Sequence, residues 1–547
     1  MNFAQYSISR LISLGIGISS VFIPVVAEAA ERIAFNYPPL GEFYIQVDDL
    51  ETFAKTGKIT SELAYYLDRL PPQQINKLPE LLSTPLEVNP LSIYKFSNST
   101  IGKAVIRNFG KGIRADIDQN GFFALRSAII SATFAPDGLN ILNLLRQFPL
   151  KTIYVDLKVI DRYIQQGGEL LEDRELISTV FFQSNSTENK SDVVLNKAEN
   201  LQTQGRFAWN KQTLTYNNPH RSAAGYFDLY QPKSTKSNLP APLIVISHGL
   251  ASSRETFAYL GKHFASHGFA VAIIEHDDIS LDKFDGFLAG SERFPEPNNL
   301  LDQPLDVKYV LDKLEQESQI NPNLQGKLNL KQVGLIGQSF GGYTVLALAG
   351  AQLIPEQTAP ECQKDSYEAV LLDLSSLAKC TFNQLSNRPY QLRDPRIKAV
   401  IALNPLGKIF GETGMSQIQA PTMFISGTND LITPPVVEQI EPFTWLENTD
   451  KYLVLVKPGT HFSFLQEGLG VLPVPDGVVG PSPSSAYPAL KALSTAFFKT
   501  YIAQQPEHRV YLTKKYLPEI NNNSFQLSII RSLTKNQLEQ TIQRKLD

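Results

Sequence analysis

The sequence predicts an α/β fold in which a doubly wound, mostly parallel sheet follows a mainly helical domain. Two patterns predict it. The carboxy-terminal part alternates short, strongly apolar runs with longer helical segments, which is typical of strands buried on both faces. The amino-terminal part carries apolar residues at helical spacing after a short β start. Helices that connect parallel strands cover both faces of the sheet, so the alternating part is expected to form one layered domain.

The first segment of the chain has the layout of an export signal. Arg10 precedes an apolar run from Leu11 to Val26, and Ala27-Glu28-Ala29 offers a small-residue cleavage site. The alternative is an uncleaved membrane anchor. The run contains Gly, Ser and Pro, however, and is shorter than the about 20 residues that span a bilayer. We therefore expect residues 1–29 to be a cleaved signal peptide and the mature protein to be exported, either to the periplasm or as a secreted protein.

Residues 30–183 are expected to form a mainly helical accessory domain. Asp48 can cap a first helix, with Glu51 closing the capping box and Gly57 ending the helix. The region contains no histidine, and its carboxylates show no catalytic spacing. A β start is expected at 32–37 and 43–47, and further helices at 122–131, 139–148 and 153–164. The simplest interpretation is an accessory domain, for example a cover over the second domain.

A polar linker over 184–205 separates this part from a second domain at 206–505. An antiparallel pair at 212–216 and 223–230 opens that domain. Buried strands are then expected at 243–247, 270–275, 333–337, 397–403, 422–426 and 452–456. Helices are expected at 254–266, 301–317, 343–349 and 486–502. Residues 506–547 remain as a helical tail, in which Thr534 and Gln537 can cap a helix.

One motif in the second domain indicates chemistry. The strand Val333–Ile336 leads into Gly337-Gln338-Ser339-Phe340-Gly341, the pattern G-x-S-x-G, and a helix follows. Such a turn exposes the serine hydroxyl, and the following helix N-terminus stabilises developing negative charge. The pattern also occurs by chance, as a Gly-rich turn with a surface serine. The flanking strand and helix favour Ser339 as a nucleophile.

A serine nucleophile needs a base, and in this context the chain order expected is Ser, then acid, then His. Only His461 and His508 follow Ser339. His461 comes directly after the strand at 452–456, on a loop at its carboxyl end, whereas His508 lies in a polar stretch after the last helix. We therefore assign His461 as the general base; a histidine with only a structural role in the loop is the alternative.

The acid should follow another strand at the same edge of the sheet, because its carboxylate must orient the imidazole and stabilise the imidazolium. Asp430 follows the strand at 422–426 and meets this condition. Asp394 precedes its strand and belongs at the opposite edge, and Glu412 lies deeper in a loop. Asp430 is therefore the expected acid, with a solvated loop residue as the alternative.

A tetrahedral intermediate needs two backbone N–H donors. We expect one from Phe340, the residue after the nucleophile, and the other from Leu250 in the loop that follows the strand at 243–247. His248 is interpreted as shaping that loop. His276 and Asp277 resemble metal-ligand spacing but lack a second cluster, so a structural or pocket-lining role is favoured.

Composition sets further limits on partners. With 50 Lys+Arg against 54 Asp+Glu, the net charge is −4, which gives no basic face for nucleic acid. The two cysteines are too few for a Cys-rich zinc module, and we expect neither a metal nor a cofactor. In an oxidising compartment, a disulfide between Cys362 and Cys380 is favoured over free thiols.

Several segments resemble one branch of the α/β-hydrolases, that of platelet-activating-factor acetylhydrolases and predicted dienelactone hydrolases. They are His248-Gly249-Leu250, the run 265–269 that leads into Glu275-His276, and Gly337 to Gly342. The resemblance covers about residues 206–505 and implies a carboxylic-ester hydrolase that needs no metal. The helical region before it resembles an uncharacterised domain that precedes such hydrolases in bacterial, especially cyanobacterial, proteins.

Two departures from that branch concern the substrate. The family often has His where this chain has Gln338, and often a basic residue where it has Asp277. Neither removes a catalytic group, but both leave the preferred head group open. Dienelactone hydrolases use a cysteine nucleophile, so Ser339 argues against that activity.

The leading hypothesis is an exported serine esterase or lipase that works through an acyl-enzyme on an ester or lipid substrate. A serine peptidase of the prolyl-oligopeptidase type shares the residue order, but the N-terminal part shows no propeller repeats. A binding protein on a hydrolase scaffold would predict a broken triad. The natural ester, the acyl preference, a transient contact with a membrane surface and the oligomeric state stay open. Apolar residues near strand ends could line a pocket or equally belong to the core: Leu250, Phe340, Leu406, Phe410, Phe462 and Phe464.

Overall fold

A computed structural model describes most of the chain. The expected signal peptide lies outside the described residues, except for its last residue, Ala29. Also outside them lie residues 184–198 of the expected linker and both cysteines of the expected disulfide, Cys362 and Cys380. The described residues are 29–37, 41–68, 71–86, 88, 90–98, 100–183, 199–233, 239–288, 297–354, 385, 388–466 and 480–543.

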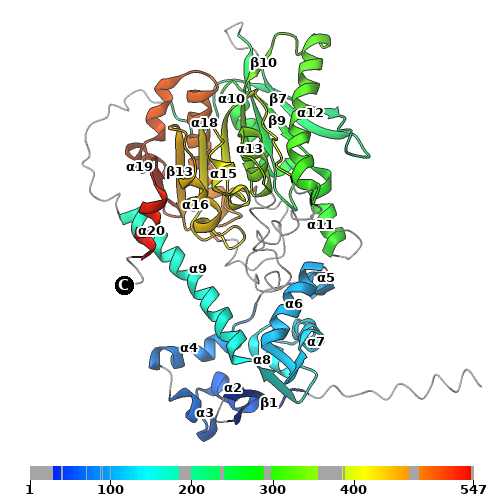
Figure 1. The fold of residues 1–547 in the computed structure, drawn as a ribbon, viewed down its shortest axis with the longest axis vertical. Coiled ribbons are helices and arrows are strands. Elements are labelled where there is room, and N and C mark those ends of the chain that lie inside the picture. The colour runs from blue at the N-terminus through cyan, green and yellow to red at the C-terminus, as the bar shows by residue number, and fades with distance from the viewer. Residues whose placement is uncertain are drawn as a thin grey trace, which may run out of the picture. The chain divides into compact units, whose positions relative to one another are not determined.

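The chain divides into two compact units (Figure 1). One comprises Met1–Ile93 and Phe109–Ile160, and the other comprises Tyr94–Asn108 and Asp161–Asp547. Three helices run across these limits in sequence: α5 (Pro90–Asn98), α6 (Thr100–Gly112) and α9 (Leu157–Gln183).

The first unit contains a five-stranded sheet with the strand order β2-β1-β5-β3-β4. Its first strand pairs antiparallel with β2 and parallel with β5. The strands are β1 (Arg32–Tyr37), β2 (Gly41–Gln46), β3 (Ile113–Asp116), β4 (Gln119–Asn120) and β5 (Thr152–Val155). The helices that lie wholly in this unit are α2 (Val47–Thr56), α3 (Ser61–Leu67), α4 (Pro72–Ser83), α7 (Phe122–Ala132) and α8 (Ile141–Arg146).

This unit has more sheet than the sequence predicts. The helix expected at 153–164 is wrong at its start, because Thr152–Val155 forms strand β5 between β1 and β3. β-branched and aromatic residues in that segment suit a strand. The helix α9 begins only at Leu157, where the Asp156 carboxylate accepts hydrogen bonds from the N–H groups of Lys158 and Val159.

The expected capping box at the start of α2 is also wrong. Gln46 precedes the helix without a side-chain cap, and the carboxylates of Asp48 and Glu51 bind the Arg146 guanidinium instead. The helix end agrees with the prediction. Gly57 adopts a left-handed φ of 72°, and its N–H donates to the carbonyl of Phe53.

The second unit is built on a nine-stranded sheet with the order β14-β13-β12-β11-β10-β8-β9-β7-β6. The central strands, in the order β13-β12-β11-β10-β8-β9, pair in parallel. The pairs β14–β13, β9–β7 and β7–β6 at the two edges are antiparallel. The predicted mostly parallel sheet is therefore confirmed. Its strands are β6 (Trp209–Tyr216), β7 (Gly225–Pro232), β8 (Ala241–Ser247), β9 (Ala270–Ile274), β10 (Leu328–Gln338), β11 (Ile397–Leu403), β12 (Thr422–Gly427), β13 (Lys451–Lys457) and β14 (Gln526–Ile530).

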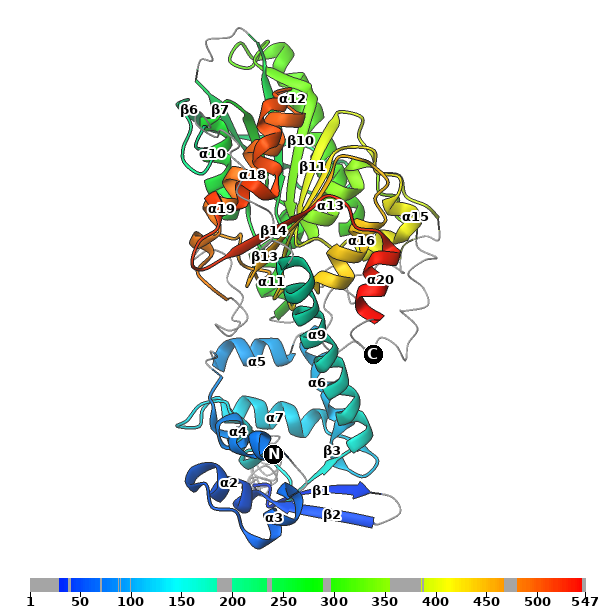
Figure 2. The same ribbon diagram turned by 90° about the vertical axis from the view of Figure 1, so that its left-hand side faces the viewer.

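Helices cover both faces of this sheet. Along β8, Leu243 and Val245 enter one apolar core, which includes residues of α12 and α13, while Ile244 and Ile246 enter another with α10 and α18. This alternation is what a strand buried on both faces requires. Figure 2 shows α10 and α18 on one side of the sheet and α13 on the other. The helices of this unit are α10 (Ala258–Ser266), α11 (Leu281–Leu288), α12 (Asn299–Ile320), α13 (Phe340–Ala349), α15 (Gly411–Met415), α16 (Glu441–Thr444), α18 (Tyr487–Tyr501), α19 (Leu517–Ile520) and α20 (Lys535–Gln543).

The tail is only partly helical. Residues 526–530 form β14, which pairs antiparallel with β13 and buries Leu527 and Ile529 in the core. The predicted cap of α20 is present, because Thr534 Oγ1 accepts from the Gln537 N–H and Gln537 Oε1 accepts from the Thr534 N–H. In the part of the chain that the structure describes, no helix is both long and apolar enough to cross a membrane.

Candidate active site

Ser339 occupies a strained turn between β10 and α13. Its φ is 57°, in a region that residues other than glycine rarely adopt, and its side chain is largely buried. The Ser339 N–H donates to the Leu403 carbonyl on β11 at 2.8 Å, and its own carbonyl accepts from the Tyr343 N–H at 3.1 Å. Strand β11 and helix α13 thus hold the turn from both sides.

Close backbone packing explains the glycines of the motif. A Cβ on Gly337 would lie 2.1 Å from the Gly341 carbonyl oxygen, and a Cβ on Gly341 would lie 2.1 Å from the carbonyl oxygen of Ser247. Backbone atoms cannot yield as a flexible side chain can. The spacing of G-x-S-x-G is therefore a steric requirement of this turn.

Asp430 and His461 meet at the carboxyl end of the sheet. His461 Nδ1 lies 2.7 Å from Asp430 Oδ2, and both side chains are buried. Asp430 follows β12 and His461 follows β13, and these are neighbouring parallel strands. With Nδ1–H directed at the carboxylate, the Nε2 atom of the imidazole is left as an acceptor.

The Asp430 carboxylate is held by further donors. Its Oδ1 accepts from the N–H groups of Ile432 and Thr433, both at 2.8 Å, and its Oδ2 accepts from the Thr433 hydroxyl at 2.8 Å. These bonds fix the orientation of the carboxylate toward His461.

The turn of Ser339 and the loop of His461 are linked through Gln338. Its Nε2 donates to the His461 carbonyl at 3.3 Å. Among the described residues, the Ser339 hydroxyl itself makes no hydrogen bond, so the contact with His461 that a proton transfer needs is not formed here. Catalytic bonds of this kind often tighten only when substrate is bound.

The loop that carries Leu250 passes directly against the Ser339 turn. A Cβ on Gly249 would lie 2.9 Å from the Cβ of Ser339, so only glycine fits this approach. Phe340 begins α13 and is buried, and Leu250 is half-buried. The loop that precedes Leu250 thus contacts the Ser339 turn, and Phe340 follows Ser339 directly in the chain.

A buried polar network lies behind this loop. His276 Nδ1 is 3.0 Å from Asp306 Oδ2, and its Nε2 is 2.9 Å from the Ser247 hydroxyl. The backbone N–H of His276 donates to His248 Nε2, and His248 Nδ1 lies 2.9 Å from the carbonyl oxygen of Gly249. The expected loop-shaping role of His248 and structural role of His276 agree with these contacts.

Burial and pairing lower the pKa values of two groups in this network. Burial lowers the pKa of the His276 imidazole below its ordinary value, although the bond to Asp306 offsets part of this effect. Burial alone would raise the pKa of the Asp306 carboxyl, but bonds from His276 and Arg221 outweigh it and hold that pKa below its usual range. The Arg221 Nε donates to Asp306 Oδ1 at 2.8 Å. Sequence reasoning missed Asp306 and Arg221, because both lie in segments without a motif.

The rejected candidates have other partners. Asp394 pairs with Arg396 at 2.6 Å, and Glu412 pairs with Lys535 at 3.1 Å. His508 lies 3.6 Å from Glu199. Within the described ranges, no group of three or more His, Cys, Asp or Glu side chains is placed to hold a metal ion.

The apolar residues near the strand ends belong mainly to the core. Phe340, Tyr343 and Phe410 stack in sequence, with ring centroids 5.4 and 5.0 Å apart. Leu406 joins the same core cluster and Phe464 the other. Core packing, the second of the two interpretations left open above, accounts for these four of the six side chains.

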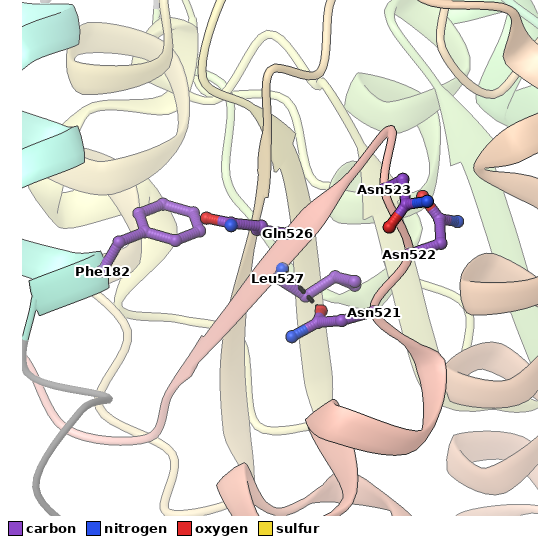
Figure 3. Close-up of a pocket in the computed structure, with 6 residues that line it drawn as sticks. All are labelled: Phe182, Asn521, Asn522, Asn523, Gln526 and Leu527. Atoms are coloured by element: carbon purple, nitrogen blue, oxygen red, sulfur yellow. Dashed lines mark hydrogen bonds between the residues drawn. The ribbon is translucent and has the colours of Figure 1, made fainter.

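A surface pocket of about 330 Å³ lies elsewhere, beside β14 and the end of α9. Figure 3 shows its lining, in which the Asn521 side chain bonds the Leu527 N–H. Its asparagines shape the local turn, as Asn522 Oδ1 accepts from two N–H groups. Three strands, β13, β12 and β11, lie between β14 and the Ser339 strand β10 in the sheet order, so this pocket is not the predicted site.

Comparisons with known proteins agree with this architecture. A family model described as an α/β hydrolase of unknown function matches residues 29–156, and a model of platelet-activating factor acetylhydrolase, isoform II, matches residues 212–284. These matches and the mostly parallel sheet of the second unit fit the α/β-hydrolase fold.

Among curated proteins, the chain is similar to platelet-activating factor acetylhydrolases. The protein of Cavia porcellus is 26% identical over 262 residues, which cover 41% of this chain and 48% of that protein. The protein of Bos taurus is 30% identical over 138 residues, or 19% of this chain and 31% of that protein. The chain thus matches less than half the length of these relatives. This similarity and the fold together support a platelet-activating-factor-acetylhydrolase-like α/β-hydrolase.

Proposed function

We propose that the chain is an exported serine hydrolase that cleaves carboxylic esters, of the lipase, phospholipase or acetylhydrolase kind. The observation that carries the proposal is the 2.7 Å contact between His461 and Asp430, at the sheet edge where Ser339 follows strand β10. The similarity to acetylhydrolases supports an ester as substrate, and the layout of residues 1–29 supports export.

In this mechanism, Ser339 Oγ attacks the ester carbonyl while its proton passes to His461 Nε2. The negative charge of Asp430 stabilises the imidazolium that forms. The oxyanion of the tetrahedral intermediate accepts hydrogen bonds from the N–H groups of Phe340 and Leu250, and loss of one such donor typically costs about 10²–10³ in rate.

Collapse of the intermediate breaks the ester C–O bond, and His461 gives its proton to the leaving alcohol. The product is an acyl-Ser339 ester. A water molecule then attacks this ester and gives its proton to His461, which returns it to Ser339 as the carboxylic acid leaves. Every proton in the cycle is carried by His461, and no metal or cofactor takes part.

The test is a comparison of the mature wild-type protein with Ser339→Ala. We expect the wild type to hydrolyse short p-nitrophenyl esters and to be labelled by a fluorophosphonate probe, and the variant to do neither. Full esterase activity in the variant would refute the mechanism. Wild-type protein that resists the probe would indicate a binding scaffold, and cleavage of prolyl peptides but not esters would indicate a peptidase. A panel of phospholipids, galactolipids, polyesters and lactones then identifies the substrate class.

A further inference from the structure

Asn404 occupies a strained position between the two strands that carry the candidate nucleophile and acid. It follows β11, which lies between β10 and β12 in the sheet. Its φ is 42°, in the left-handed region, and its side chain is fully buried. Asparagine tolerates this region better than other residues with a Cβ, but the conformation still costs energy.

The Asn404 side chain joins two loops. Its Oδ1 accepts from the N–H of Gly427, three residues before Asp430, at 2.9 Å. Its Nδ2 donates to the carbonyl of Thr460, the residue before His461, at 3.0 Å. One amide thus uses its acceptor on the acid loop and its donor on the histidine loop.

The backbone of Asn404 strengthens the same connection. Its carbonyl oxygen lies 3.2 Å from the Thr433 hydroxyl oxygen, and that hydroxyl donates to Asp430 Oδ2 at 2.8 Å. Its N–H donates to the Ile425 carbonyl on β12 at 2.9 Å. The preceding residue, Leu403, accepts the N–H of Ser339. The segments of all three candidate catalytic residues therefore meet at the end of β11.

We propose that Asn404 is a positioning residue that sets the register between the Asp430 loop and the His461 loop. The inference rests on the proposed function, since it assigns the side chain a role in that reaction. Asparagine alone combines the necessary features. Aspartate lacks the amide donor, glycine accepts the backbone conformation but has no side chain, and glutamine is longer by one methylene.

Two substitutions separate the backbone from the hydrogen bonds. Asn404→Gly relieves the left-handed conformation and removes both side-chain bonds. Asn404→Asp keeps the size and the acceptor, loses the donor to Thr460 and adds a negative charge near the Asp430–His461 pair. The matched control is Asn522→Gly, because Asn522 makes the same kind of bridge at the β14 edge, accepting from Phe525 and donating to the Ser485 carbonyl at 2.8 Å.

The experiment measures kcat and KM for p-nitrophenyl acetate between about pH 5 and 9, with active sites counted by fluorophosphonate titration so that unfolded protein does not contribute. A loop displaced by about 1 Å can cost about 10²-fold in rate. We expect Asn404→Gly to lower kcat about 10- to 100-fold with KM changed less than about threefold. In Asn404→Asp, the added charge should also shift the acid limb of the kcat/KM profile to higher pH, because a nearby negative charge favours the imidazolium.

Asn522→Gly should keep the wild-type kcat and pH profile. Wild-type kcat and an unshifted acid limb in both Asn404 variants would overturn the positioning role while leaving the proposed function intact. A wild-type protein that neither hydrolyses the ester nor reacts with the probe would overturn both.

Discussion

Asp306 Oδ2 lies 3.0 Å from His276 Nδ1, and both side chains are fully buried. Asp306 also accepts from Arg221 and from the Asn218 side chain, each at 2.8 Å. Removing a buried carboxylate of this kind destabilises the fold, because its former partners then remain buried without a hydrogen-bond acceptor. His276 and His248 connect this network to Ser247 and Gly249, which lie in or next to the loop that carries Leu250.

Asp306→Ala is therefore expected to lower the free energy of unfolding by about 3–5 kcal/mol, the typical cost of removing one member of a buried ion pair. Urea unfolding followed by fluorescence measures it. The control is Asp312→Ala, which removes an exposed partner of Arg396 and should cost less than about 1 kcal/mol. Equal small losses in both variants would contradict the prediction.

The same substitution has a pH signature. In the folded chain the pKa of Asp306 lies below its ordinary value. Its stabilising contribution is therefore complete above about pH 4, the ordinary pKa of an aspartate, and is lost as the pH falls through the lower folded-state pKa. The stability difference between wild type and Asp306→Ala should shrink in acid; a constant difference down to about pH 2 would argue against the pairing.

Asp302 should behave in the opposite way. Burial raises its pKa to about 6, so the folded state disfavours its charge. The resulting penalty is present above that pKa and absent below about pH 4. Asp302→Asn should raise the free energy of unfolding by about 1 kcal/mol near pH 7.5, after allowance for solvent screening of a partly exposed group. Chemical unfolding at both pH values checks this, and a gain near pH 4 as large as that near pH 7.5 would speak against burial as the cause.

The imidazole of His461 depends on Asp430 for its tautomer. Asp430→Asn is expected to lower kcat by about 10³–10⁴, because an amide that donates to Nδ1 would leave the proton on Nε2. The steady-state rate on p-nitrophenyl acetate measures the loss. Asp450→Asn is the control, since Asp450 precedes β13 at its other end and bonds Tyr501. An Asp430→Asn enzyme within tenfold of wild type would mean that another residue supplies the acid.

The turn at Ser339 has no room for a side chain at Gly341. Gly341→Ala would place a methyl group 2.1 Å from the Ser247 carbonyl oxygen and push apart the two segments that carry the predicted oxyanion donors. We expect kcat to fall about 100-fold or more. Gly326→Asn serves as the control, because Gly326 has a left-handed φ of 69° with open space around it, which asparagine tolerates. Near-normal turnover in Gly341→Ala would show that the turn can relax.

The central sheet and the meeting of Asp430 with His461 follow from local patterns. The central strands β8, β9, β11, β12 and β13 are short, mainly apolar runs, and the carboxyl ends of neighbouring parallel strands lie at one edge. Residues placed just after two such runs must therefore be close, even without knowledge of the loops. The catalytic roles of Ser339, Asp430 and His461 stay predictions until the variants are measured.

The missed features depend on partners far away in the sequence. Strand β5 is a strand because β1, about 120 residues earlier, offers it an edge. Asp306 stands in the middle of α12, where its sequence context is that of an ordinary helix, and only packing brings it to His276 and Arg221. Asn404 lies in no recognisable motif either. Its proposed positioning role rests on the hydrogen bonds that its side-chain oxygen and nitrogen make to Gly427 and Thr460.

Residues near the carboxy-terminal end, Gln526–Ile530, form strand β14 and complete the edge of the sheet. It occupies the outer side of β13, whose far end leads to the loop of His461. A chain shortened after residue 505 would leave the backbone N–H and C=O groups of β13 unpaired and open to a strand from another molecule, which is a common route to aggregation. The second unit should therefore not be trimmed to the span that the sequence resemblance covers, and any shortened form for assay or crystallisation should retain the chain through Ile530.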